Sequence, residues 1–374
     1  MIHLSKPYFD KREIKAVEET LDSGWVAGQG PKGIELSEQV KSLTETKYAI
    51  PLNNCTAGLH LSLLAVGIKP GDEVLVSDYT FPATGHAIMY CGAMPIFVDV
   101  NIKSYNMDPN LIEEKINKNT KAILVVHVFG QVADMGPILN IATKHNLKVI
   151  EDAACAMGAK YNGKPAGSFG DIASFSFHAR KNATCGEGGI VVTNNECYAD
   201  IVSSLSCFGI DSAFKRQNEF VIPSFTALGY NYKLSDINAS IAYEQVKKYP
   251  DTVERKRSIA ALYNNLLENN EFISIPYEAP DNYHIYQTYA ITLDKRINRD
   301  KLILSLKSEG IQTQIGTYAS HIQPVYNSKD KCPNSLFLFR QSLALPLYYE
   351  LSEEQCRYVA EKLNFHINKQ VSGK

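Results

Sequence analysis

Residues 175–189 read FSFHARKNATCGEGG, and this stretch decides the fold more clearly than any other part of the chain. It places Lys181 between an apolar strand, which includes Phe175 and Phe177, and a glycine-rich turn. Upstream, the apolar run 147–150 leads to Asp152, which lies 29 residues before the lysine. Lys181 and Asp152 are therefore the first candidates for a catalytic pair.

One cofactor chemistry needs a lysine and a carboxylate together. A lysine amine condenses with the aldehyde of pyridoxal 5′-phosphate as a Schiff base, provided that burial or nearby positive charge keeps some of the amine neutral. A carboxylate beside the ring nitrogen holds it protonated, so that the ring accepts electrons from the substrate carbon. Taken singly, Asp152 is better explained as the end of a strand and Lys181 as a solvated lysine. Taken together with the flanking pattern, the pair favours the cofactor site.

Apolar runs alternate with helix-like segments through the first half of the chain. The expected strands are 73–76, 95–98, 122–126, 149–150, 172–177 and 189–192. This βαβ order predicts an α/β fold with a mainly parallel sheet covered by helices. A nucleotide-binding fold has the same rhythm, but Gly28–Gly33 matches its glycine fingerprint without a preceding strand and is expected to be a loop.

The chain has 374 residues, enough for two domains. We expect a large cofactor-binding domain over residues 1–245 and a smaller α+β domain over residues 246–374. A long polar helix beginning near Ala239 would connect them. A strand at 286–291 and a helix at 300–309 would belong to the smaller domain.

Composition restricts the class of protein. The formal net charge is −2 without a long basic run, so no nucleic-acid partner is expected. The eight cysteines form no C-x-x-C pair, which predicts reduced thiols, no metal site and a cytoplasmic location. No signal peptide and no apolar run of about 18 residues is found, so no membrane association is expected.

A phosphate site is expected at the start of the first well-defined helix. Apolar residues recur at helical spacing between Leu61 and Ile68, so the helix should begin near Thr56 and Ala57. Its free amides and the positive end of its dipole attract an anion, and the Thr56 hydroxyl would cap it. On this feature alone, an ordinary capped helix is the better explanation.

The chain resembles the DegT/StrS family of sugar aminotransferases, which use pyridoxal phosphate on the fold of aspartate aminotransferase (fold type I). The resemblance covers nearly the whole chain in the expected order. Besides the segments around Asp152 and Lys181, it rests on SGWV at 23–26, NCTAG at 54–58, PGDEV at 70–74, YTFPAT at 79–84, GYNYK at 229–233 and LPLY at 345–348. It implies a seven-stranded sheet in the large domain.

The resemblance also implies roles for individual residues. Thr56 and Ala57 match the phosphate-binding start of a helix, and Ser176 matches a phosphate-binding serine on a strand. Phe81 matches the aromatic residue that stacks on the cofactor ring. Asn231 matches an asparagine that reaches the phosphate from the neighbouring subunit, which implies a homodimer with shared active sites. A core phenylalanine and a turn asparagine are the alternatives for Phe81 and Asn231.

The chain departs from the family pattern at three places. Cys155 stands where many relatives have glutamine or histidine facing the ring hydroxyl of the cofactor, and a thiol is a weak hydrogen-bond partner. Lys233 replaces a frequent arginine, keeping the charge but losing the bidentate geometry. GTYASH at 316–321 replaces the usual histidine-tyrosine pattern of the substrate-facing loop, in which Tyr318 and His321 are candidate substrate contacts.

Lysine at position 181 also distinguishes two reactions of the family, because its sugar dehydratases carry histidine there. The resemblance therefore implies a transaminase in which Lys181 holds the cofactor and then shuttles a proton between substrate and cofactor. The implied donor is glutamate, and the implied acceptor is a nucleotide-linked keto-deoxysugar that becomes an amino sugar. Alternatives are an aminocyclitol- or aminobenzoate-forming relative, a non-catalytic regulatory protein on this fold and, more remotely, a nicotinamide-dependent enzyme.

Overall fold

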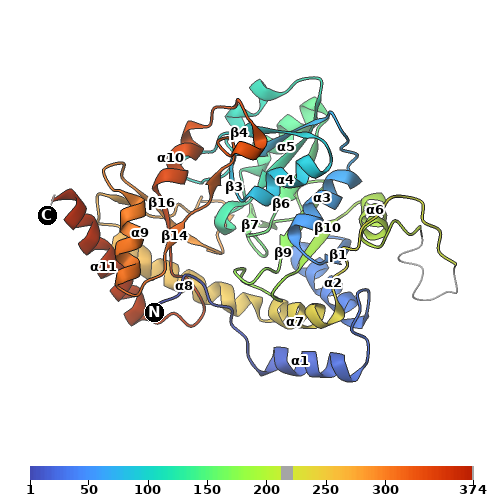
Figure 1. Ribbon diagram of the computed structural model, residues 1–374, viewed down its shortest axis with the longest axis horizontal. Helices are drawn as coiled ribbons and strands as arrows, with labels where there is room; N and C mark the ends of the chain where they lie inside the picture. Colours follow the sequence, from blue (N-terminus) through green and yellow to red (C-terminus); the bar gives the residue numbers. More distant parts are fainter. Residues whose placement is uncertain (212–221, 373–374) are drawn as a thin grey trace.

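A seven-stranded sheet forms the centre of the computed structural model, which describes residues 1–211 and 222–372 (Figure 1). In spatial order its strands are β1 (Tyr48–Leu52), β10 (Gly189–Thr193), β9 (Ile172–Ser176), β6 (Lys148–Asp152), β5 (Thr120–Val126), β2 (Glu73–Ser77) and β4 (Met94–Val98). Strand β10 is antiparallel to both of its neighbours, and the other neighbouring pairs are parallel. The predicted α/β fold with a mainly parallel sheet is confirmed.

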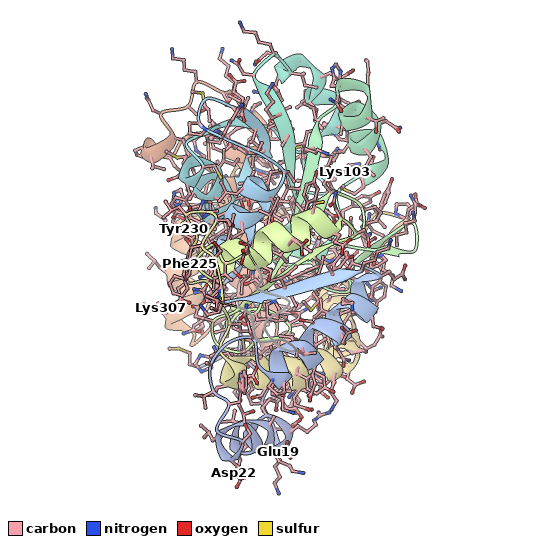
Figure 2. The ribbon with its side chains drawn as sticks, turned by 90° about the vertical axis from the view of Figure 1, so that its right-hand side faces the viewer. Glu19, Asp22, Lys103, Phe225, Tyr230 and Lys307 are labelled. Carbon is pink, nitrogen blue, oxygen red and sulfur yellow. The ribbon has the colours of Figure 1, made fainter. Side chains whose placement is uncertain are left out.

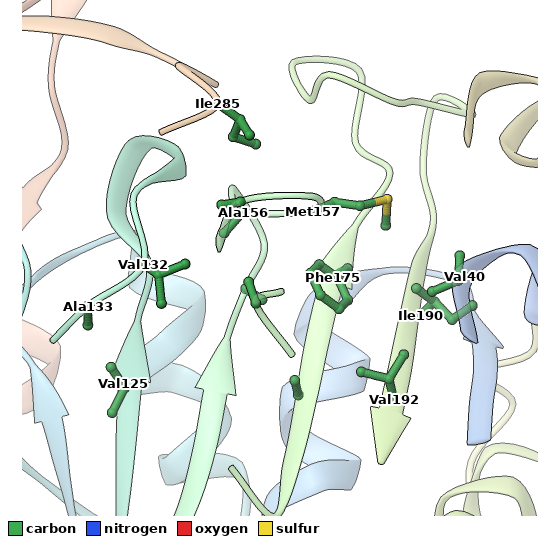
Figure 3. Packing of buried hydrophobic residues seen from close by; sticks show 14 of the residues in the cluster. Val40, Val125, Val132, Ala133, Ala156, Met157, Phe175, Ile190, Val192 and Ile285 are labelled. Carbon is green, nitrogen blue, oxygen red and sulfur yellow. The ribbon is translucent and has the colours of Figure 1, made fainter. Parts of the chain in front are cut away.

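Helices cover both faces of this sheet. On one face lie α2 (Pro31–Thr44), α5 (Met135–His145) and α7 (Asp236–Lys247), and on the other lie α3 (Cys55–Ala65), α4 (Pro82–Tyr90) and α6 (Glu196–Ser206). Within β2, Leu75 faces the first set while Val74 and Val76 face the second, as the two-residue period of a strand requires. Figure 3 shows the first core, in which Phe175, Ile190 and Val192 pack between neighbouring strands.

Two details of this domain differ from the sequence analysis. Strand β1 was not expected, because Pro51 interrupts its apolar pattern; at the edge of the sheet the missing N–H of proline is tolerated. The segment Gly28–Gly33 is a loop only as far as Gly30, because α2 begins at Pro31. The amides of Lys32 and Gly33 donate to the carboxylate of Asp236 at 3.0 and 2.8 Å, which stabilises this helix start.

A second sheet, wholly antiparallel, has the order β11 (Ile273–Ser274), β13 (Tyr289–Leu293), β16 (Ser342–Leu345) and β14 (Gln314–Ile315). It packs with α8 (Tyr249–Leu267), α9 (Arg299–Ser308) and α11 (Glu353–Val371) around a separate core (Figure 1). The strand expected at 286–291 lies slightly later, as β13. The expected helix 300–309 is present as α9.

The connection between the two sheets is made by two helices rather than one. Helix α7 ends at Lys247, and α8 starts at Tyr249, followed by Pro250, which supplies no amide to continue the earlier helix. Helix α8 packs Val253 into the core of the large sheet and Tyr263 into the core of the second sheet. The domain boundary at residue 245 stays a prediction, since α8 belongs to both cores.

The remaining elements are short or peripheral. They are α1 (Lys11–Asp22), which contacts α7, α10 (Pro333–Gln341), the ribbon of β3 (Tyr79–Thr80) with β15 (Tyr318–Ala319), and the small sheet of β12 (Asn282–Tyr283), β7 (Lys160–Tyr161) and β8 (Lys164–Pro165). All eight cysteines are free thiols. Among the described residues, no helix combines the length and the apolar character that a membrane crossing requires.

Candidate active site

Asp152 is the last residue of β6 and is almost completely buried. Its Oδ2 accepts a hydrogen bond from Thr84 Oγ1 at 2.7 Å, and its Oδ1 accepts one from the amide of Ala154 at 3.2 Å. Burial raises the pKa of Asp152, although the bond from Thr84 acts against this shift. Thr84 in turn contacts Thr80 of β3, four residues earlier, at 2.9 Å. A carboxylate held from two sides and aimed from a strand end is well placed to face a ring nitrogen.

Lys181 lies five residues after the end of β9 and close enough to Asp152 to interact with it electrostatically. Its Nζ lies 3.0 Å from Cys155 Sγ. Burial lowers the pKa of Lys181, but Cys155, Cys55 and Asp152 together raise it above its ordinary value. The lysine and the aspartate are thus electrostatic neighbours, although 29 residues separate them in the sequence. The thiol that replaces the family's glutamine or histidine is the closest polar group to the lysine amine.

The expected anion site exists as a helix start, but its cap differs from the prediction. Asn54, not Thr56, is the N-cap of α3, and its Oδ1 accepts from the amide of Ala57 at 2.7 Å. The helix begins at Cys55, one residue before the predicted start. Asparagine is among the strongest capping residues because its short side chain reaches back to the first turn. The correction leaves the Thr56 hydroxyl free of the capping role and available to a ligand.

The glycine-rich turn has a packing role beside this helix start. Gly189 opens β10 and pairs with Ser176, the last residue of β9. A Cβ on Gly189 would come within 2.5 Å of the backbone of Asn54 and Cys55, so only glycine allows this approach. Ser174 Oγ donates to the carbonyl of Cys55 at 3.2 Å. Because residues two apart share a face of a strand, Ser176 lies on the same side as Ser174, toward α3.

Phe81 and Tyr318 meet beside the ribbon of β3 and β15. Phe81 is the N-cap of α4 and is 63% exposed, so it is not a core residue. The ring of Tyr318 packs edge-on against it, with centroids 6.2 Å apart. The contact follows from the ribbon, in which Tyr318 pairs with Thr80 and Ala319 pairs with Tyr79. An exposed aromatic ring next to a second one is suited to a flat ligand.

His321 is directed away from this aromatic pair. Its Nδ1 lies 2.7 Å from Asp78 Oδ2, and its amide donates to Asp78 Oδ1 at 2.6 Å. Burial lowers the pKa of His321, but Asp78 raises it above its ordinary value. Cys332 joins them in a group whose ligand-type atoms lie within 4.8 Å of one another. Since the imidazole and the carboxylate bind each other directly, we interpret the group as a structural hydrogen-bonded pair. A substrate contact of His321 stays a prediction.

Asn231 and Lys233 lie beside the end of α6 and β1, where the backbone of Asn231 pairs with Cys207 and that of Lys233 pairs with Leu52. Lys233 Nζ donates to Asn231 Oδ1 at 2.5 Å and lies 4.5 Å from the centroid of the Phe208 ring. Lys233 also lines a groove of about 280 Å³ between α2 and β1. Figure 2 labels Phe225 and Tyr230 close together on this side of the molecule, and Phe225 is largely exposed. Whether Asn231 reaches a second active site stays a prediction.

Sequence reasoning missed three groups that shape the site. Thr84, which binds Asp152, was within a quoted motif, and its spacing from Thr80 was the available signal. Asn54 could have been found as a capping residue directly before an apolar helix. Asp78 gave no signal, because its partner His321 lies 243 residues away.

The residues present fit pyridoxal phosphate. The Asn54 cap takes the amide of Ala57, so an anion at this helix start would meet the amides of Cys55 and Thr56, which have no intrahelical acceptor. Asp152 supplies a buried carboxylate, Lys181 an amine, and Phe81 an exposed ring face. These groups lie at the end of β6, after β9, and at the starts of α3 and α4, which the large sheet brings together at one end of its strands. The arrangement provides for a phosphate, a ring and an aldehyde at once.

Comparisons with known proteins give the same assignment. The family model "DegT/DnrJ/EryC1/StrS aminotransferase family" matches residues 7–364. GDP-perosamine synthase of Escherichia coli O157:H7 is 37% identical over 364 residues, covering 97% of this chain and 98% of its own. Spr1654 of Streptococcus pneumoniae, solved in a PMP form, superposes with a TM-score of 0.92 at 27% identity, covering 98% of both chains. DesI, solved in the presence of its TDP-sugar product, gives a TM-score of 0.90 at 28% identity over 98% of this chain and 93% of its own. The chain belongs to the DegT/DnrJ/EryC1/StrS aminotransferase family and is an aminotransferase.

Proposed function

We propose that this protein transfers an amino group from glutamate to a nucleotide-linked keto-deoxysugar, using pyridoxal phosphate held by Lys181. The observation that carries the proposal is the convergence of the Lys181 amine and the buried Asp152 carboxylate beside the start of α3. A dehydratase of the same family would carry histidine in place of this lysine. The substrate class is supported by relatives whose names include a GDP-perosamine synthase and a protein solved with a TDP-sugar product.

The residues divide the work by position. When bound, the cofactor supplies an electron sink for the carbon that loses its proton. Asp152, a buried carboxylate, would keep the ring nitrogen protonated. Thr56, Ser176 and the helix start at Ala57 would hold the phosphate. The Lys181 amine would hold the cofactor aldehyde and would move the proton at the reacting carbon.

The substrate side is formed by Phe81 and Tyr318. Their edge-on contact ties the ribbon of β3 and β15 to the start of α4. Phe81 would cover one face of the cofactor ring, which leaves Tyr318 at the entrance used by the sugar. Glutamate and the sugar would use this entrance in turn, because both must meet the same Lys181.

The proposal is tested by the ultraviolet-visible spectrum of the purified protein loaded with pyridoxal phosphate. Glutamate should convert the visible band of lysine-bound cofactor into the band of its aminated form, and a nucleotide-linked keto sugar should restore the first band. A band that glutamate leaves unchanged would contradict the donor. Conversion by glutamate without restoration by any keto sugar would favour an aminocyclitol- or aminobenzoate-forming enzyme. A folded protein with no band would favour a regulatory role.

We further propose that the working unit is a homodimer in which Asn231 reaches the phosphate of the second copy. The support is the exposed position of Asn231, whose backbone pairs with Cys207 next to the exposed residue Phe208, on the segment whose Tyr232 carbonyl accepts from the Asn53 amide just before α3. Mixing inactive Lys181→Ala and Asn231→Ala proteins should restore part of the activity in hybrid dimers, because one of the two sites then has both residues intact. No rescue despite proven subunit exchange would overturn the shared site.

A further inference from the structure

Helix α8 carries a buried lysine that the roles above do not use. Lys256 is 4% exposed, and its Nζ donates to Asn182 Oδ1 at 2.6 Å and to the carbonyl of Gln287 at 3.3 Å. Both acceptors are neutral, and within residues 1–211 and 222–372 no carboxylate forms an ion pair with this amine. A buried amine without a carboxylate costs stability whenever it is charged. Its position therefore calls for an explanation.

Lys256 and its partner Gln287 bind the residues that flank the reacting amine of Lys181. Asn182 follows Lys181 in the chain, and the Gln287 side chain donates to the carbonyl of Arg180 at 3.0 Å. Lys256 and Gln287 thus hold the residues on both sides of Lys181. Because α8 contributes to both cores, it fixes the Lys181 loop relative to both sheets.

The fold also places Lys256 near Cys155. Gln287, whose carbonyl Lys256 binds, lies beside Cys155, since a Cβ on Gly130 would be 3.0 Å from the Gln287 amide nitrogen and 3.2 Å from the Cys155 carbonyl oxygen. Burial lowers the pKa of Lys256 to about 7, Cys155 raises it and Lys181 lowers it. The other titratable groups of this neighbourhood are Tyr249, on which Cys155 acts, and the Asp152 and Cys55 side chains, which act on Lys181. The amines of Lys181 and Lys256 and the thiol of Cys155 therefore lie close enough to interact electrostatically.

The chemistry of the cofactor suggests a role for the amine of Lys256. In pyridoxal phosphate the ring hydroxyl is on the ring carbon next to the one that bears the aldehyde, so its oxygen would lie close to the Lys181 nitrogen through covalent connectivity alone. That oxygen carries negative charge and is stabilised by a hydrogen-bond donor or a cation. Cys155, 3.0 Å from the lysine nitrogen, is a weak donor. The Gln or His of related proteins would be a stronger one.

Building on the proposed function, we propose that Lys256 is a positioning residue of this site whose ammonium stabilises the negatively charged ring oxygen of the cofactor beside Cys155. The oxygen anion in turn keeps Lys256 charged, since an opposite charge favours its ammonium form. A cation at this place also disfavours a proton on the nitrogen that joins Lys181 to the cofactor. That nitrogen therefore loses its proton at a lower pH than it would without Lys256.

The test is a pH titration of the absorption spectrum of the loaded protein, which reports the protonation of that nitrogen independently of turnover. In Lys256→Met, the midpoint should rise by about one pH unit or more, because a nearby cation is lost. Lys256→Arg keeps the charge and should titrate closer to the unmodified protein. The matched control is Lys247→Met, which removes a partly exposed lysine paired with Glu244 and should leave the midpoint unchanged.

A second variant tests the compensation for Cys155. In a Cys155→Gln background an amide donor is restored to the ring oxygen, so the Lys256→Met shift should fall to about half or less of its size in the unmodified background. An equal shift in both backgrounds would contradict the link between the thiol and Lys256.

The outcomes separate this inference from the proposed function. A visible cofactor band whose midpoint is the same with and without Lys256 overturns the inference alone. A protein that shows no cofactor band at all overturns both. If Lys256→Met does not fold, Lys256→Gln keeps a donor for Asn182 without the charge, and the same measurement on it decides.

Discussion

The cofactor side and the substrate side of this site are built in different ways. The cofactor side consists of strand ends of the large sheet and the start of α3. Its residues Asp152, Lys181 and Asn54 each lie in a short continuous motif of the sequence. The substrate side is a ribbon of β3 and β15, which joins residues more than 230 positions apart. The first side takes its residues from the large sheet, although Lys256 and Gln287 also bind its Lys181 loop, whereas the second side exists only while both sheets are docked. Mutations should therefore affect chemistry on the first side and docking or affinity on the second.

The largest effect is expected on the cofactor side, from Lys181→Ala. Turnover should fall by at least about 1000-fold, because the variant loses both the covalent anchor and the proton carrier. Multiple turnovers are measured with glutamate and the identified keto sugar. The far-ultraviolet circular dichroism should be unchanged as a control. Turnover near the rate of the unmodified protein would show that Lys181 has no role in the reaction. It would then contradict the proposed difference between the two sides.

The next effect is expected from Asp152→Asn. The rate of the glutamate half-reaction should fall on the order of 100-fold, since an amide no longer holds the ring nitrogen protonated. The fold should survive, because the asparagine oxygen still accepts from Thr84. Single-turnover absorption changes provide the rate. Thr84→Val is the matched comparison: it keeps the carboxylate and should cost less. Equal rates for Asp152→Asn and the unmodified protein would reject the electron-sink role.

On the substrate side, His321→Ala should reduce stability rather than chemistry. Loss of the imidazole leaves the Asp78 carboxylate buried without its partner and should cost about 3 kcal/mol of unfolding free energy. The folded pKa of His321 is raised above its ordinary value, so its contribution is fully present below the unfolded pKa of about 6.5 and is lost as pH rises through the folded pKa. Denaturant unfolding at pH 6 should therefore show a larger loss than unfolding above the folded pKa.

A surface pair serves as the control for this effect. His145 contacts Glu113 at 2.7 Å in a more exposed setting, and His145→Ala should change stability by less than about 1 kcal/mol. Equal losses from His321→Ala and His145→Ala would show that the Asp78 pair does not support the docking of the two sheets.

The smallest effect is expected from Tyr318→Leu. Removing the ring from the contact with Phe81 should raise KM for the sugar by roughly 3- to 10-fold, the size of one aromatic contact. Tyr318→Phe keeps the ring and should stay near the unmodified value. The kcat of both variants and the glutamate half-reaction serve as controls. A large fall in the half-reaction rate would mean that the ribbon also shapes the cofactor side.

The sequence predicted the fold class and most of the large sheet, because buried strands are recognisable as short apolar runs between turns. It did not predict β1, whose proline breaks that pattern, nor the division of the connecting helix at Lys248. It identified Lys181 and Asp152 as a pair, since each follows a strand and the fold aligns strand ends. It assigned the helix cap to Thr56 rather than Asn54, because both residues are good caps and only the backbone geometry distinguishes them.

What the sequence alone determined is the chemistry: a lysine, a carboxylate and a helix start, each fixed by its immediate neighbours in the chain. What only the tertiary structure decided is which distant side chains surround that chemistry. Thr84 on Asp152, Cys155 against Lys181, Lys256 on Asn182 and Asp78 on His321 all join residues from 26 to 243 positions apart. Local propensity and periodicity carry no information on such pairs, because they form only when separate elements pack against one another.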